Sequence, residues 1–210
     1  MKEGVEMVFI NDSLNVMLVG DWNKLYIQPD WIATNVFEKD EIQIGVNGEG
    51  SEFSVSYRAD GITIAPTQSK IIFSVWNTDE ESLEKLSVCL NNFLEKVHIP
   101  TTFVYGINGD FVEDDDSLFA EVLDGMSDSN ILIENGYQIL STQVTRTLVV
   151  NEKIINMESN LENARMTIHF NEHHVDQDKT CTFNTEMLNG FIRQCRKIVL
   201  ELGYQLEGDE

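Results

Sequence analysis

Residues 78–100 read TDEESLEKLSVCLNNFLEKVHIP, and their spacing of apolar side chains predicts a long helix. Thr78 followed by Glu81 matches a capping box, which satisfies backbone N–H groups at a helix start. Apolar residues then recur every three or four positions, as in a helix with one buried face. The helix must stop before Pro100, because proline has no N–H to donate and clashes with the preceding turn. The predicted buried stripe is Leu83, Leu86, Leu90, Phe93, Leu94 and Val97.

A second long helix is predicted from about Thr185 to Leu202, and Gly203 is a suitable residue to end it. Each long helix closes a similar order of elements: a strand, a short helix, several strands in hairpins, then the helix itself. We therefore expect an α+β fold of two tandem β-α-β(3–4)-α halves, 1–100 and 101–206, with a flexible tail at 207–210. The predicted buried stripe of the second helix is Leu188, Phe191, Ile192, Cys195, Val199 and Leu202.

The strands between the helices are predicted from runs of alternating apolar residues. Hairpin turns are expected at Asn47-Gly48, Asp60-Gly61 and Asn151-Glu152, the first two because such pairs adopt positive φ at low cost. Each antiparallel sheet should bury its apolar face under its own long helix. The expected elements are strands at 14–20, 41–47, 52–59, 62–65, 70–76, 101–112, 137–150, 153–158 and 165–171, with short helices at 29–37 and 118–124.

This order of elements resembles the tandem, saddle-shaped fold of the TATA-box-binding protein family. The resemblance concerns topology over most of the chain and includes no sequence motif. It implies a helix-on-sheet architecture in each half. The DNA-binding role of that family is not expected here, because the charge of this chain has the wrong sign.

The chain is strongly acidic, with 14 Lys and Arg against 36 Asp and Glu and a formal net charge of −22. A field of this sign repels phosphate backbones and anionic lipid, so we expect no binding to nucleic acid or membranes. No apolar run approaches the ~20 residues of a membrane span, and the start lacks the basic region of a secretory signal. The three cysteines have no CxxC spacing and fit no disulfide framework. Cytoplasmic residence is the resulting expectation.

The acidic residues are concentrated where basic ones are missing, since no Lys or Arg occurs between Lys96 and Arg146. The simplest interpretation is a solvated surface with helix-capping carboxylates. A second is a docking ridge for a basic protein, and a third, the weakest, is a divalent-cation site, since the EF-hand pattern is absent. The candidate protein-binding residues are Asp110, Glu113, Asp114, Asp115, Asp116, Glu121, Asp124 and Asp128.

A second cluster contains His169, His173, His174 and Cys181, which are residue types that bind zinc. His169 alternates with Met166, Ile168 and Phe170 and so falls on the polar face of its strand. The preferred interpretation is a solvated strand end and loop. Zinc binding and a Cys–His nucleophile are the alternatives, and the nucleophile lacks an orienting third group. No metal, cofactor or catalytic residue is predicted.

These observations favour a non-enzymatic acidic module that binds a basic protein partner, of the inhibitor, immunity-protein or chaperone type. The alternative is a small-ligand-binding domain or enzyme, with its site between sheet and helix or between the two halves. A homo-oligomer is also possible on this sequence. Arg193, Arg196 and Lys197 form a compact basic patch that either supports the last helix or contacts the acidic region of a second copy.

Overall fold

The structure is a computed structural model in which nine stretches of the chain are described. They are residues 6–22, 27–49, 52–67, 69–97, 103–113, 131–132, 134–162, 165–176 and 181–207. The predicted boundary at Pro100 and the predicted short helix at 118–124 lie outside these stretches. The predicted tail at 207–210 lies outside them except for Glu207.

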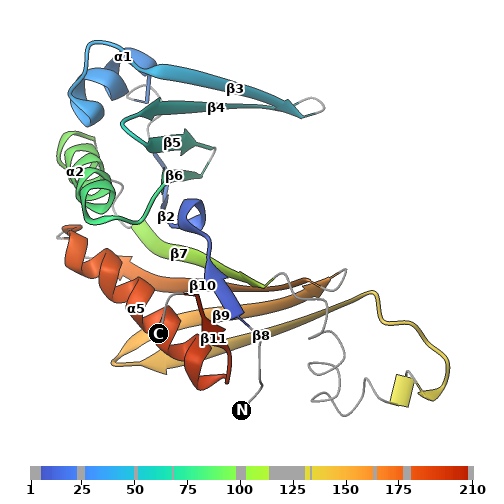
Figure 1. The fold of residues 1–210 in the computed structure, drawn as a ribbon. Coiled ribbons are helices and arrows are strands. Elements are labelled where there is room, and N and C mark those ends of the chain that lie inside the picture. Colours follow the sequence, from blue (N-terminus) through green and yellow to red (C-terminus); the bar gives the residue numbers. More distant parts are fainter. Residues whose placement is uncertain are drawn as a thin grey trace. The chain divides into compact units, whose positions relative to one another are not determined.

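The described residues form the strands and helices labelled in Figure 1. The helices are α1 (Pro29–Ile32), continued by the π-helical turn η3 (Ala33–Phe37), then α2 (Glu80–Lys96) and α5 (Thr185–Glu201), with a 3₁₀ turn η1 at Asn11–Ser13. The strands are β1 (Glu6–Phe9), β2 (Asn15–Val19), β3 (Gln43–Glu49), β4 (Glu52–Ala59), β5 (Ile62–Pro66), β6 (Lys70–Val75), β7 (Phe103–Glu113), β8 (Ser141–Val150), β9 (Lys153–Glu162), β10 (Arg165–Asp176) and β11 (Gln205–Leu206).

The prediction of two separate helix-backed halves is wrong. The described strands form one 11-stranded sheet, in which nine strands follow the order β3-β4-β5-β6-β2-β7-β10-β9-β8 and β1 and β11 lie off this path. β2 and β7, which the prediction assigned to different halves, pair antiparallel from Asn15↔Asn108 to Val19↔Val104. The physical reason is that both strands have apolar side chains on one face and free backbone groups at their edges, and joining them satisfies those groups.

The chain divides into two compact units, and each unit includes segments that are distant in sequence. Unit 1 contains Met1–Ile10, Gly109–Asn171 and Arg193–Glu210. Unit 2 contains Asn11–Asn108 and Glu172–Ile192. Long elements pass from one unit into the other, since β7, β10 and α5 each have residues in both.

In unit 2, α2 packs on β5, β6 and η3 through the predicted stripe, every member of which is buried. Phe93 is fully buried, with its ring 5.5 Å from Trp22, 6.1 Å from Trp31 and 5.4 Å from Phe73. Rings at these separations and tilts add attraction to the burial of apolar area. This aromatic cluster is the centre of the core of unit 2.

The start of α2 differs from the predicted capping box. Asp79, rather than Thr78, is the N-cap, and its carboxylate accepts a hydrogen bond from the Ser82 N–H at 2.8 Å. The Thr78 hydroxyl instead donates to the Asn11 Oδ1 at 2.7 Å. Aspartate caps as well as threonine does, so a long-range bond to Asn11 is sufficient to move the helix start by one residue.

Two of the predicted hairpin turns are confirmed. Asp60 and Gly61 have φ of 50° and 80°, and Asn151 and Glu152 have φ of 51° and 67°. The turn predicted at Asn47-Gly48 is wrong. These two residues pair with Ser54 and Phe53 inside the β3–β4 ladder, which continues to Glu49↔Glu52. An Asn-Gly pair permits a turn, but the longer ladder supplies more backbone hydrogen bonds.

In unit 1, β1 pairs with two partners, parallel to β11 and antiparallel to β7. Phe111 is fully buried, and its ring lies 5.1 Å from Phe9 and 5.8 Å from Phe170. β8 and β9 form a long antiparallel hairpin from Ser141↔Glu162 to Val150↔Lys153. This hairpin and the adjoining β10 carry the candidate functional surface.

Candidate functional site: a polar sheet face

Two of the eight predicted protein-binding residues are described, and both lie on β7. Asp110 is half-buried, and its Oδ1 is 2.5 Å from the Nδ1 of His169. Glu113 is 2% exposed, so its side chain is not part of a solvated ridge. The other six lie outside the described residues: Asp114, Asp115, Asp116, Glu121, Asp124 and Asp128.

Glu113 has an electrostatic effect inside unit 1. Burial raises the pKa of the Tyr204 hydroxyl, the nearby Glu113 charge raises it further, and Arg146 lowers it. A buried carboxylate close to a phenol favours the neutral phenol. Glu113 is therefore an interior residue of this unit, and its charge acts on Tyr204.

Next to this interior, the strands of unit 1 present a polar sheet face. On β10, Met166, Ile168 and Phe170 are buried, while Thr167 and His169 alternate with them and are partly exposed. The same period of two on β9 buries Ile155 and Met157. The polar sheet face consists of Asp110, Thr147, Asn156, Glu158, Asn160, Thr167, His169 and Asn171.

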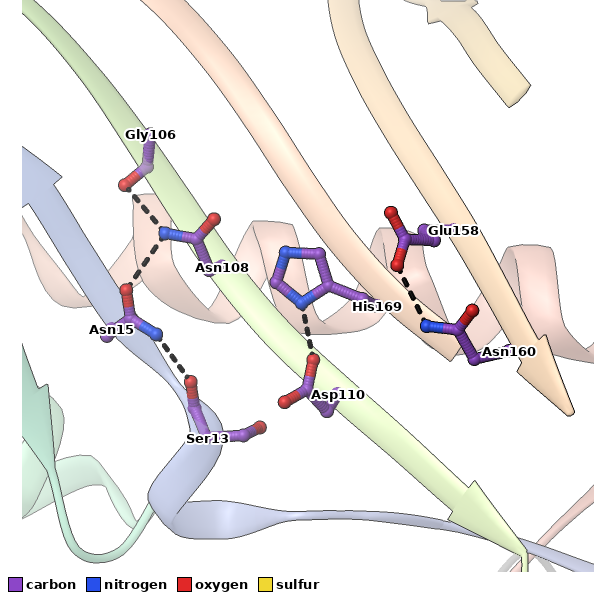
Figure 2. Close-up of polar contacts among 8 residues, drawn as sticks. All are labelled: Ser13, Asn15, Gly106, Asn108, Asp110, Glu158, Asn160 and His169. Atoms are coloured by element: carbon purple, nitrogen blue, oxygen red, sulfur yellow. Dashed lines mark hydrogen bonds and ion pairs between the residues drawn. The ribbon is translucent and has the colours of Figure 1, made fainter. Parts of the chain in front are cut away.

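Hydrogen bonds join side chains of the polar sheet face, both between neighbouring strands and within β9. The Thr147 hydroxyl donates to Asn156 Oδ1 at 2.9 Å, and the Asn156 amide donates to Asn171 Oδ1 at 3.4 Å. Asn160 donates to the Glu158 carboxylate at 2.8 Å, beside the His169–Asp110 pair (Figure 2). These short amide and hydroxyl side chains are preorganised, since they already hold one another in place.

The His169–Asp110 pair gives the polar sheet face a charge that depends on pH. The hydrogen bond to Asp110 raises the pKa of His169 above its ordinary 6.5, burial opposes this, and the charges of Asp110 and Glu158 raise it further. Protonated His169 neutralises Asp110. Deprotonation therefore makes this face more negative.

We expect Asp110→Asn to lower the pKa of His169 toward its ordinary value. Because the folded pKa of His169 is raised, the pair stabilises the fold fully below about pH 6.5, and this contribution is lost as the pH rises through the folded pKa. Proton NMR titration of the ring gives the pKa, with His169→Gln to assign the signal. The difference in urea midpoint between wild type and Asp110→Asn should shrink as the pH rises. An unchanged pKa in Asp110→Asn would show that Asp110 is not the cause.

A groove of about 590 Å³ lies at the end of the β8–β9 hairpin near Ser141 and Glu162. Its walls combine hydroxyl, amide and carboxylate groups with the Arg165 guanidinium. Such a lining offers hydrogen-bond donors and acceptors beside apolar surface, which includes Leu161. The lining residues are Ser141, Thr142, Gln143, Asn160, Leu161, Glu162, Arg165 and Thr167.

Unit 2 has a polar row of its own that crosses six strands. Asn108 donates to Asn15 Oδ1 at 2.9 Å, and Asn15 donates to the Ser13 carbonyl at 2.8 Å (Figure 2). Trp76 is 58% exposed, and its indole N–H donates to the Thr63 hydroxyl at 3.3 Å. By register, the row is Gln43, Arg58, Thr63, Ser74, Asn15 and Asn108.

The histidine–cysteine cluster predicted as an alternative zinc site is divided between the two units. His169 pairs with Asp110 in unit 1. In unit 2, the His174 Nε2 lies 2.6 Å from the Glu172 Oε1, and its ring stacks on Tyr105 at 4.5 Å with planes 8° apart. His173 is exposed and Cys181 is partly buried. No group of three or more His, Cys, Asp or Glu side chains able to hold a metal ion occurs among the residues that the structure describes.

The two cysteines on the long helices are buried, as the helical pattern predicts. Burial raises the pKa of Cys89 to about 12, and the charges of Asp60 and Glu38 add to the increase. A thiol with this pKa is protonated at neutral pH and is a poor nucleophile. Cys89 therefore acts as a small apolar side chain.

The sequence places His169 on a polar strand face but does not reveal the hydrogen bonds around it. The available signal was the alternation of Asn and Thr with apolar residues on β9 and β10.

Among the helices described, none combines the length and apolar character needed to cross a membrane. In comparisons with known proteins, the chain matches no protein-family model and no curated protein.

Proposed function

We propose that this protein is a non-enzymatic binding module for a basic protein partner and that the partner docks on the polar sheet face of unit 1. The observation that carries the proposal is two hydrogen-bonded groups on this face, Thr147–Asn156–Asn171 across three strands and Asn160–Glu158 on β9. Together they are a preorganised set of acceptors and donors in a chain of net charge −22. Amide and carboxylate oxygens are suitable acceptors for Lys and Arg. An inhibitor, immunity protein or chaperone would use such a surface.

Binding in this proposal has two stages. The negative field of the whole chain attracts a basic surface and raises the rate of encounter. The polar sheet face then forms short-range hydrogen bonds, with Glu158 supplying a carboxylate beside the His169–Asp110 pair. Salt weakens the first stage most, because the Debye length falls from about 10 Å at 0.1 M to about 3 Å at 1 M.

The proposed location is the cytoplasm. The three cysteines form no disulfide in the structure, as expected in a reducing compartment. The small-ligand or enzymatic alternative remains a prediction, and the groove near Arg165 is the feature that a polar ligand would use.

Glu158→Lys is expected to reduce the capture of basic proteins. The substitution replaces a central acceptor of the polar sheet face by a cation, and a nearby like charge repels a basic partner. Immobilised wild-type and variant protein are exposed to lysate at low and high salt, and the bound proteins are identified by mass spectrometry. Wild type should enrich proteins of high isoelectric point at low salt, and Glu158→Lys should lose most of this enrichment.

Glu95→Lys is the matched control, because it makes the same charge change at an exposed position in the last turn of α2, where a cation is tolerated. It should retain most of the capture. Equal losses in the two variants would mean that only net charge matters. Equal capture by wild type at both salt levels, or no preference for basic proteins, would reject the proposal itself.

A further inference from the structure

β8 is a long edge strand whose side chains are all at least partly exposed. In the strand order it lies at one end of the sheet, next to β9 alone among the described strands. It spans ten residues, Ser141–Val150, and none of its side chains is buried. Its ladder with β9 is continuous over the whole length, without a bulge. The outer edge of β8 is therefore a straight row of backbone donors and acceptors.

β8 also has few of the features that normally prevent edge pairing. Proteins protect exposed edges with charges, proline, bulges or short strands. β8 contains Arg146 as its single charged residue, and no Asp or Glu occurs between Glu134 and Glu152. β3, at the other end of the strand order, contains two glycines and Glu49. In a chain of net charge −22, an acid-free edge rich in β-branched residues is an exception.

The acid-free edge favours one occupant, a second copy of β8. Two copies of this chain repel each other wherever acidic surfaces meet, and the repulsion is least where both surfaces lack acids. The β8 edge fulfils this condition on both sides of a symmetric contact. A two-fold axis makes such a contact self-complementary and closed.

Symmetry and charge together determine the register. A two-fold axis that relates two antiparallel neighbouring strands of one sheet is perpendicular to that sheet. It keeps each side chain on its own face, so one residue of the strand must lie opposite the same residue of the second copy, with the axis at that position. The strand centre lies between Thr145 and Arg146. An axis at Arg146 would place two guanidinium groups directly opposite each other, which is unfavourable.

We propose that this protein forms a dimer in which β8 pairs antiparallel with β8 of a second copy, about a two-fold axis through Thr145. Thr145 then faces Thr145 of the second copy, a favourable threonine pair. Val144 faces Arg146, and Ser141 faces Val149, which is 75% exposed in the single chain. The inference does not rest on the proposed function, because it uses the backbone edge of β8 and a second copy of the chain, although Thr145 lies opposite Glu158 on the polar sheet face.

Cysteine cross-linking tests the register. In a Cys181→Ser background, whose two other cysteines are buried, Thr145→Cys should form a disulfide-linked dimer under mild oxidation, since the two cysteines are directly opposite. Thr147→Cys is the control: in the same register the two cysteines are offset by four residues, about 14 Å along the strand, and should not link. Efficient linking through Thr147 and not Thr145 would overturn the proposed register.

Light scattering and analytical ultracentrifugation test the dimer itself. Wild type should dimerise with increasing concentration, and alternate amides of β8 should become protected from hydrogen exchange. Thr145→Glu should raise the dissociation constant roughly tenfold or more, because two carboxylates meet at the axis. Ser69→Glu, at an exposed loop position of unit 2, should leave it unchanged. Wild type that remains monomeric at high concentration, or a dimer that Thr145→Glu does not weaken although the variant is folded, would overturn the proposal.

Discussion

Phe93→Ala is expected to lower the free energy of unfolding by about 3–5 kcal/mol, the usual cost of removing a buried phenylalanine ring. Phe93 is fully buried and contacts the rings of Trp22, Trp31 and Phe73. Truncation removes the apolar area of the ring and leaves a cavity, because the neighbouring rings relax only partly around alanine. The free energy of unfolding of a folded protein is about 5–15 kcal/mol in total, so the loss is a large part of its stability.

Urea unfolding followed by tryptophan fluorescence measures this loss, since Trp22 and Trp31 flank the site. Val88→Ala on the same helix is the control, because Val88 is 48% exposed and its truncation creates no cavity. The control should change the free energy of unfolding by less than about 0.5 kcal/mol. If Phe93→Ala lowers the free energy of unfolding by less than about 1 kcal/mol, the aromatic cluster is not the core of unit 2.

His174→Phe is expected to lower the free energy of unfolding by about 1–3 kcal/mol, the cost of removing a hydrogen bond from a buried polar group. Glu172 is 1% exposed, and its Oε1 lies 2.6 Å from the His174 Nε2. Phenylalanine preserves a ring against Tyr105 but offers no N–H. The comparison therefore isolates the hydrogen bond from the stacking.

His174→Gln makes the complementary change, keeping an amide donor and losing the ring. It should retain part of the stability that His174→Phe loses, if the bond to Glu172 matters more than the contact with Tyr105. His173→Phe, at the exposed neighbouring position, is the control and should leave the urea midpoint nearly unchanged. A His174→Phe protein as stable as wild type would mean that the carboxylate of Glu172 is satisfied without His174.

The candidate site was only partly predictable. The alternation around His169 placed its side chain on the polar face, and the structure confirms this. Its partner Asp110 is 59 residues away in sequence, and the pairing required β7 to lie beside β10. Glu113 was predicted in the acidic region and is buried, because β7 continues beyond the predicted strand end at Val112. Burial at a strand end depends on the neighbouring strands, which composition does not show.

By itself, the sequence determined the local features: the buried face of α2, the turns at Asp60-Gly61 and Asn151-Glu152, and the polar face of β10. These follow from side-chain periodicity and from residues that accept positive φ, both of which act within a few positions. Only the tertiary structure decided that β2 pairs with β7 and that one sheet replaces two. The physical reason is that backbone N–H and C=O groups are the same in every residue, so strand partners are selected by long-range packing of whole faces.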